Sequence, residues 1–314
     1  MAPARSVLDL IGNTPLVDVS QLSPAPGVRI LAKLEGQNPG GSVKDRIALA
    51  MVEAAEADGS LKRGQTILEP SSGNTGIGLA MICRIKGYGL QIVLPENVST
   101  ERRQLLEIFG AEVILSPGEE GSNGAVRMAQ RLAKELPDVV MLYQYGNPAN
   151  AGAHYRGTGP EIWRDCPEVT HFVAGLGTSG TLMGVGRYLK EQNPKIKVWA
   201  IEPPAGELVQ GLRSLDDGFV PPIFDPEVLD RKVIVRPRES IEWTRRLTAE
   251  AGVFAGISSG AAVAGAARVA TQIGGEGGVI VVVLADGGWK YLSTGVWTDD
   301  LDEVVERASR IVYF

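Results

Sequence analysis

The sequence predicts an α/β protein of two units, each a mainly parallel sheet with helices on both faces. Short apolar runs alternate with amphipathic runs along most of the chain, which is typical of buried parallel strands and their connecting helices. Many of the 39 glycines stand where an apolar run passes into an amphipathic one. The 314 residues suffice for two hydrophobic cores, at about 150 residues a domain.

The first sixty residues contain the most distinctive turn of the chain. A short helical segment near residue 6 precedes a turn into an extended piece, 11–17, and residues 29–35 form the next expected strand. The turn Asn-Pro-Gly-Gly-Ser-Val-Lys-Asp-Arg (38–46) then opens a helix that runs toward residue 58. The spacing of Ser42 and Asp45 predicts a capping box, which places Lys44 in the first helical turn.

The rest of the chain alternates between strand and helix, with two breaks. We expect strands at 66–69, 90–94, 112–115, 139–143, 170–174, 198–202 and 279–285, and helices at 76–86, 100–109, 123–135, 181–191, 240–251 and after 260. One break is a polar segment that crosses from residue 147 toward 163, and the other is the irregular stretch 203–240. We therefore predict a smaller domain, 41–147, and a larger one formed by 1–40 and 148–314.

Composition and charge disfavour several classes of protein. Thirty-one basic and 37 acidic side chains give a net charge of −6, which argues against nucleic acid or an anionic membrane as the main partner. We see neither a membrane-spanning apolar run nor a signal peptide. Cys83 and Cys166 lie far apart, and only two histidines accompany them, so we predict no metal site and a cytoplasmic location.

Lys44 is a candidate for covalent chemistry with a carbonyl compound. The helix dipole is positive where Lys44 is expected, so an ammonium there is disfavoured, and burial would lower its pKa further. A lysine that loses its proton is a nucleophile suited to Schiff bases. Without other signals, a solvated lysine at a helix start is the commoner interpretation, so the assignment depends on the rest of the chain.

The loop Gly-Leu-Gly-Thr-Ser-Gly-Thr (175–181) matches a dinucleotide-binding fingerprint. Glu202, at the end of the next strand, stands about where a ribose-binding acid is expected. Backbone N–H groups at a helix start, however, bind any phosphate. The hydroxyls of Thr178, Ser179 and Thr181 favour a terminal phosphate monoester over a pyrophosphate.

Two further loops complete a ligand class. Ser-Ser-Gly-Asn-Thr-Gly (71–76) offers hydroxyls, an amide and N–H groups to a carboxylate, and Gly-Ile-Ser-Ser-Gly (256–260) turns a serine inward. Each loop by itself is more often plain helix capping. A phosphate cradle, a carboxylate cradle and a reactive lysine together indicate pyridoxal phosphate, a phosphorylated aldehyde that condenses with amino acids.

These motifs, with Gln-Tyr-Gly-Asn-Pro-Ala-Asn (144–150), resemble the cysteine synthase family of fold-type-II pyridoxal phosphate enzymes, which share a tryptophan synthase β-like fold. The resemblance covers nearly the whole chain in order and displaces the dinucleotide interpretation. It implies that Lys44 holds the cofactor and moves the Cα proton. It also implies that Asn74 bonds the ring hydroxyl oxygen, that Ser258 faces the ring nitrogen, and that Gly177, Thr178, Ser179, Gly180 and Thr181 bind the phosphate. The substrate carboxylate would lie against Ser71, Ser72, Thr75 and Gln144.

The segment 211–221 resembles an actinobacterial branch of the family that uses O-phosphoserine and a thiocarboxylated sulfur-carrier protein. Arg213 would then receive the phosphate leaving group, since a guanidinium matches a phosphate dianion. The alternative is a surface arginine paired with Asp216 or Asp217. Three other functions remain: the same chemistry on O-acetylserine, a cystathionine β-synthase-like condensation, and a pseudoenzyme. The condensation is disfavoured, since we see no regulatory extension.

The resemblance further implies a homodimer acting on an amino-acid substrate. The chain ends in Ile-Val-Tyr-Phe (311–314), which is unusually apolar for a solvated terminus. Such an end is more often a docked segment or a dimer contact than a lid over a cleft.

Overall fold

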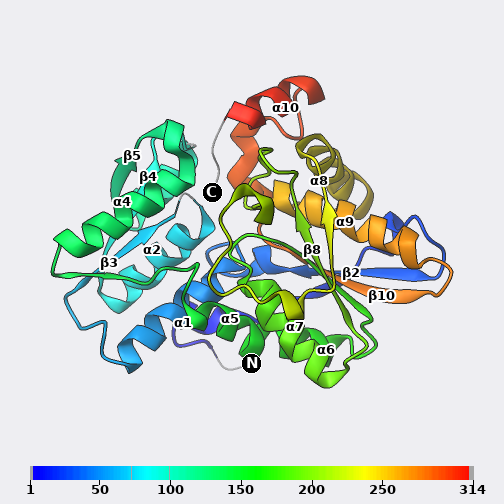
Figure 1. Cartoon of the computed structure of the whole chain (residues 1–314), viewed down its shortest axis with the longest axis horizontal. Coiled ribbons are helices and arrows are strands. Elements are labelled where there is room, and N and C mark those ends of the chain that lie inside the picture. Colours follow the sequence, from blue (N-terminus) through cyan, green and yellow to red (C-terminus); the bar gives the residue numbers. More distant parts are fainter. Residues whose placement is uncertain (1–2, 72, 99, 311–314) are drawn as a thin grey trace.

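The computed structural model describes residues 3–71, 73–98 and 100–310, which form two sheets flanked by helices (Figure 1). The six-stranded sheet has the order β1-β2-β10-β7-β8-β9, and the four-stranded sheet has the order β5-β4-β3-β6. All pairings are parallel except that of β1 with β2. The predicted α/β class with mainly parallel sheets is confirmed. The domain boundaries at 41 and 147 stay a prediction.

The six-stranded sheet takes its strands from the N-terminal part of the chain and from the part after residue 170. Its strands are β1 (Leu16–Asp18), β2 (Val28–Leu34), β7 (His171–Gly175), β8 (Lys197–Glu202), β9 (Arg231–Ile234) and β10 (Gly278–Leu284). Its principal helices are α7 (Gly180–Gln192), α8 (Pro237–Ala251) and α9 (Ile257–Ile273). Because β10 pairs with β2, the strand that precedes Lys44 lies beside the strand that ends the alternating pattern.

The four-stranded sheet carries the helix that starts at Lys44. Its strands are β3 (Thr66–Pro70), β4 (Gly89–Pro95), β5 (Glu112–Ser116) and β6 (Val139–Met141). Its helices are α1 (Lys44–Ala57), α2 (Asn74–Lys86), α3 (Thr100–Ile108) and α4 (Gly121–Glu135). In Figure 1 this unit lies at the left and the six-stranded sheet at the right.

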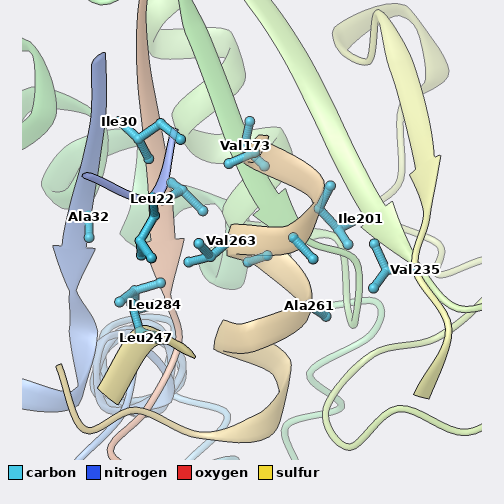
Figure 2. Packing of buried hydrophobic residues seen from close by; sticks show 14 of the residues in the cluster. Leu22, Ile30, Ala32, Val173, Ile201, Val235, Leu247, Ala261, Val263 and Leu284 are labelled. Atoms are coloured by element: carbon cyan, nitrogen blue, oxygen red, sulfur yellow. The ribbon is translucent and has the colours of Figure 1, made fainter. Parts of the chain in front are cut away.

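The largest hydrophobic cluster packs α9 against the six-stranded sheet (Figure 2). The cluster contains Val263 and Ala261 of α9 together with side chains of four strands, among them Ile30, Val173 and Ile201. The alanines and glycines of α9 let the helix approach the sheet closely, since a Cβ on Gly265 would lie 2.1 Å from Ile201 Cδ1. This contact holds the start of α9, with Ser258, at a defined place.

Both breaks in the predicted alternation contain regular structure. Between residues 147 and 166 the chain forms α5 (Pro148–Ala153), a π-helical turn (His154–Thr158) and α6 (Gly159–Asp165). The Asn147 side chain accepts from the Ala149 N–H at 2.9 Å and starts α5. The buried face of this helical segment includes the polar side chains Asn150, His154 and Thr158, so apolar periodicity does not mark it. Strand β9 lies within the other segment, 203–240.

Four buried charged side chains join β2, α1 and α6. Arg46 pairs with Glu35 and with Glu161 at 2.7 Å each, and Lys33 pairs with Glu161 at 2.7 Å. Although burial opposes ionisation, Arg46 and Lys33 lower the pKa of Glu161 to about 2. The two positive and two negative charges compensate one another, which permits their burial and fixes α1 beside the larger sheet.

We expect Glu161→Gln to destabilise the protein by about 3–5 kcal/mol, because it leaves buried cations without a counter-charge. Urea unfolding followed by circular dichroism measures the loss. Glu107→Gln removes a carboxylate from an exposed pair with Arg103 and should cost less than about 1 kcal/mol. Equal effects of the two substitutions would show that the buried network does not hold the fold.

Candidate active site

One pocket collects side chains from both units at the carboxyl ends of their strands. It lies where α/β proteins usually place their ligands. Its lining residues are Val43, Lys44, Ser71, Gly73, Asn74, Thr75, Arg102, Gln144, Tyr145, Gly177, Thr178, Gly211, Arg213, Ser258, Ala285 and Tyr291. Among the predicted site residues, nine line this pocket, and Ser179, Gly180 and Thr181 follow directly on Thr178. Ser72 lies outside the described residues.

Lys44 is the first residue of α1, and its backbone N–H donates to the Ser42 hydroxyl at 3.2 Å. Loss of solvation lowers the pKa of the Lys44 amine, while the carboxylates of Asp286 and Glu35 oppose that shift. The amine thus reaches its neutral, nucleophilic form at lower pH than an exposed lysine does.

The capping box predicted for this turn is wrong. The Asp45 carboxylate accepts from the Gly40 N–H at 2.5 Å, five residues back, and Val43 occupies the N-cap position. The glycine-rich turn curls over the start of the helix, so Asp45 faces Gly40. A Cβ on Gly40 would lie 2.6 Å from the Asp45 carboxylate, which explains why glycine is needed there.

The loop between β7 and α7 presents polar groups that suit an anion. Ser179, the N-cap of α7, has a left-handed backbone with φ of 67°. Its hydroxyl is buried and has no hydrogen-bond partner among the described residues. Thr178 accepts from the Gly180 N–H at 3.4 Å. A strained backbone, an unpaired buried hydroxyl and the first N–H groups of a helix suit a phosphate.

The glycines of this loop have packing reasons that differ from those of a dinucleotide site. A Cβ on Gly180 would lie 1.9 Å from Asn150 Oδ1, and one on Gly175 would lie 2.4 Å from a Leu212 methyl group. Glu202 is buried, and its carboxylate pairs with Lys232 at 2.7 Å. The acid expected to bind a ribose is therefore a structural ion-pair partner.

The start of α2 forms the second cradle. The Ser71 hydroxyl accepts from the Gly76 N–H at 3.0 Å. The Thr75 hydroxyl donates to the side-chain Oε1 of Gln144 at 2.7 Å. The backbone N–H of Gln144 donates to the buried Glu69 carboxylate at 2.9 Å. These bonds bring Ser71, Thr75 and Gln144 together although they come from two segments of the chain.

Two buried side chains of the unexpected helical segment support both cradles. Asn150 donates to the Gln144 carbonyl at 2.8 Å and to the Thr178 hydroxyl at 3.0 Å. His154 Nε2 lies 3.2 Å from the Thr181 hydroxyl, and burial lowers the pKa of its imidazole well below the usual value. The 144–150 motif contains Asn150, but nothing in the sequence distinguishes His154 from a core histidine.

Arg213 is buried and contacts aromatic rings. Its guanidinium carbon lies 4.6 Å from the ring centre of Phe219 and 5.4 Å from that of Tyr145. Its Nη1 donates to Asn123 Oδ1 at 3.3 Å, and its backbone N–H donates to the Leu176 carbonyl at 2.7 Å. The alternative of a surface arginine is wrong.

The neighbouring acids have other partners. Asp216 lies 3.6 Å from the Lys232 ammonium, and Asp217 accepts from the Gly206 N–H at 2.9 Å. Arg213 instead lines the pocket that Lys44 also lines.

Some other features of the sequence are accounted for by packing. Cys83 and Cys166 are buried free thiols, and burial raises the pKa of each.

Within the described ranges, no group of three or more His, Cys, Asp and Glu side chains could hold a metal ion. No described helix is both long and apolar enough to cross a membrane. The apolar end, 311–314, lies outside the described residues.

The residues present fit pyridoxal phosphate. The buried Ser179 hydroxyl at the start of α7 has no hydrogen-bond partner among the described residues. It could donate to a phosphate oxygen. Lys44, with its lowered pKa, lines the same pocket as Thr178 of that cradle. One phosphorylated aldehyde could therefore place its phosphate in the loop and its aldehyde at the amine.

Comparisons with known proteins agree with this fit. The model of the family described as pyridoxal-phosphate dependent enzyme matches residues 7–286. Cysteine synthase B of Pseudomonas aeruginosa is 44% identical over 293 residues, which cover 93% of this chain and 97% of that protein. A cysteine synthase of Staphylococcus aureus is 43% identical over 307 residues, covering 95% and 98%.

Solved structures show the same fold. The crystal structure of cysteine synthase (OASS) from Entamoeba histolytica has a TM-score of 0.89 and 35% identity, covering 97% of this chain and 96% of that one. The structure of O-ureido-L-serine synthase has a TM-score of 0.88 and 41% identity, covering 94% and 95%.

The two sheets, the lysine and the anion cradles thus define an enzyme that depends on pyridoxal phosphate, and the chain belongs to that family. Within the family it is a cysteine synthase, as are its relatives in Pseudomonas aeruginosa and Staphylococcus aureus at 44% and 43% identity. The predicted cofactor and enzyme class are confirmed. The predicted cytoplasmic location stays a prediction.

Proposed function

We propose that this cysteine synthase replaces the phosphate of O-phospho-L-serine by sulfur, with Lys44 as the catalytic residue. The observation that carries the proposal is that Arg213, which is buried, lines the same pocket as Lys44, Ser71, Thr75 and Gln144. A substrate with a carboxylate at one end and a phosphate at the other needs two separate anion-binding groups, and the pocket offers both.

Pyridoxal phosphate, when bound, withdraws electrons from the Cα of an amino acid condensed with its aldehyde, which makes the Cα proton acidic. We assign its phosphate to the cradle Gly177, Thr178, Ser179, Gly180 and Thr181. We assign Asn74, the first residue of α2, to the ring hydroxyl oxygen and Ser258, the second residue of α9, to the ring nitrogen. Both side chains line the pocket, which supports the assignment.

Lys44 would form the covalent link to the aldehyde carbon until the substrate amine displaces it. As the released free amine, Lys44 would then take the proton from Cα. A general base works best when its pKa lies near the working pH, and the lowered pKa of Lys44 supports this role. Ser71, Thr75 and Gln144, with Ser72 from the resemblance, would hold the substrate carboxylate and thereby orient the Cα proton.

Arg213 would receive the leaving phosphate. Stacking over Phe219 and Tyr145 orients the planar guanidinium before substrate arrives, so less side-chain entropy is lost on binding. Arg102 also lines the pocket and adds positive charge. A phosphate dianion gains more from these groups than a neutral leaving group does.

O-acetylserine is the second candidate substrate, because a related structure carries the name O-acetyl serine sulfhydrylase. The two candidates are separated by measuring kcat/KM for each with sulfide as the sulfur donor. We expect the higher value for O-phosphoserine. A higher value for O-acetylserine would overturn the substrate proposal and leave the enzyme class intact.

A thiocarboxylated carrier protein and a homodimer complete the proposal. Both rest on the resemblance stated above, the carrier on the segment 211–221. Replacing sulfide by a small thiocarboxylated protein in the same assay tests the donor, and sedimentation velocity tests the dimer. No rate gain with the thiocarboxylate would contradict the carrier.

We expect Ser258→Asp to slow β-replacement by on the order of 10- to 100-fold, because a carboxylate would hold a proton on the ring nitrogen and strengthen the ring as an electron sink. Ser258→Ala removes the hydroxyl without adding charge and should have a smaller effect. Turnover and the visible spectrum of the bound cofactor measure both. An unchanged spectrum in Ser258→Asp would show that residue 258 does not face the ring.

A further inference from the structure

Both ends of the Asn74 side-chain amide are held by charged residues that sequence reasoning did not select. Asn74 Nδ2 donates to Asp286 Oδ2 at 2.8 Å, and Asn74 Oδ1 accepts from the Lys290 ammonium at 2.6 Å. Asp286 lies two residues after the end of β10, and Lys290 lies in the 3-10 segment η8 (Gly288–Thr294). The contacts therefore join α2 of the smaller sheet to the end of the larger sheet.

Asp286 is buried in a tightly packed place. The Tyr291 hydroxyl donates to its Oδ2 at 2.7 Å, and its Oδ1 has no hydrogen-bond partner among the described residues. A Cβ on Gly256 would lie 2.1 Å from that oxygen. The carboxylate thus has little freedom to turn away from Asn74.

Lys290 is also buried, and it reaches the turn that carries Lys44. Its ammonium donates to the Gly41 carbonyl at 3.3 Å, besides its bond to Asn74. Burial lowers the pKa of Lys290 to about 8, and Arg102 adds to that shift, while Asp286 and Asp45 oppose it. One ammonium therefore connects the start of α1 with the start of α2.

An asparagine amide can turn by half a rotation with little change of shape, which exchanges its donor and acceptor ends. A carboxylate at one end and an ammonium at the other permit only one orientation, since the reverse would place oxygen against oxygen and N–H against N–H. In the permitted orientation, the second hydrogen on Nδ2 is left for an acceptor in the pocket. A ring hydroxyl oxygen is such an acceptor.

We propose that Asp286 and Lys290 are positioning residues that fix the Asn74 amide and so set how firmly the pocket holds the ring oxygen of the cofactor. The proposal rests on the role assigned to Asn74 above. It predicts that either charged residue acts on the cofactor through Asn74 rather than directly.

The test is a double-mutant cycle on the binding of pyridoxal phosphate to the apoprotein. We expect Lys290→Met to weaken binding by about 10- to 100-fold and to change the visible spectrum of the bound cofactor. In the Asn74→Ala background, Lys290→Met should change neither quantity further. Asp286→Asn with Lys290→Met removes both charges of this pair and serves as the variant of choice if the single change does not fold.

The outcomes separate the two levels of inference. If Asn74→Ala alters neither affinity nor spectrum, the role assigned to Asn74 fails and the positioning proposal fails with it. If Asn74→Ala alters both and the Lys290 and Asp286 variants alter neither, only the positioning proposal is overturned. Additive effects of Lys290→Met and Asn74→Ala would mean that Lys290 acts directly, which also contradicts it.

Discussion

Lys44→Ala should lower kcat/KM for β-replacement by at least about 1000-fold and abolish the visible absorption band of the bound cofactor. The substitution removes both the amine that bonds the aldehyde and the base for the Cα proton. Alanine suits the first turn of α1, and the Ser42 hydroxyl can still accept from the backbone N–H of residue 44. The fold should therefore persist, as circular dichroism will show.

Lys62→Ala is the matched control, because Lys62 is exposed and lies in the connection between α1 and β3. It should leave spectrum and turnover unchanged. Retention of the band and of near-normal turnover in Lys44→Ala would show that another amine performs the chemistry.

Arg213→Ala should lower kcat/KM for O-phosphoserine by on the order of 30- to 1000-fold. The change removes charge-assisted hydrogen bonds of roughly 1.5–3 kcal/mol each from a buried site, and two such bonds need not add fully. O-acetylserine has no charged leaving group, so its kcat/KM should change far less. Steady-state assays of both substrates with saturating sulfide measure the difference.

Arg213→Lys should recover only part of the loss. An ammonium keeps the charge but has neither the planar fork nor the stacking over Phe219 and Tyr145. Arg103→Ala, which removes an exposed cation from α3, controls for a general change of charge. Equal losses on both substrates in Arg213→Ala would mean that Arg213 only supports its loop, and O-acetylserine would become the favoured substrate.

The predictable parts of the fold and site are those encoded by contiguous residues. The strands at 66–69, 90–94 and 112–115 lie within one residue of β3, β4 and β5. The two largely buried ones, β3 and β4, are predictable because buried parallel strands are continuous apolar runs. The loop at 175–181 leads into the start of α7 as predicted, because its hydroxyls and the N–H groups of that helix start are neighbours in the chain.

The parts that were missed depend on buried polar groups. Residues 148–165 are helical, although their buried face is rich in polar side chains that bond to one another and to the loops. The spacing of Ser42 and Asp45 predicted a capping box, whereas the turn of the backbone brings the Gly40 N–H to the Asp45 carboxylate.

The sequence by itself therefore determined the α/β class, and it placed Lys44 and two hydroxyl-rich loops at helix starts, since a helix start creates its polar groups locally. Only the tertiary structure decided which charges meet. Lys290 contacts Asn74 across 216 positions of sequence, and Arg46 meets Glu161 across 115. The cost of burying a charge depends on the partners that folding brings to it, and distant elements supply those partners.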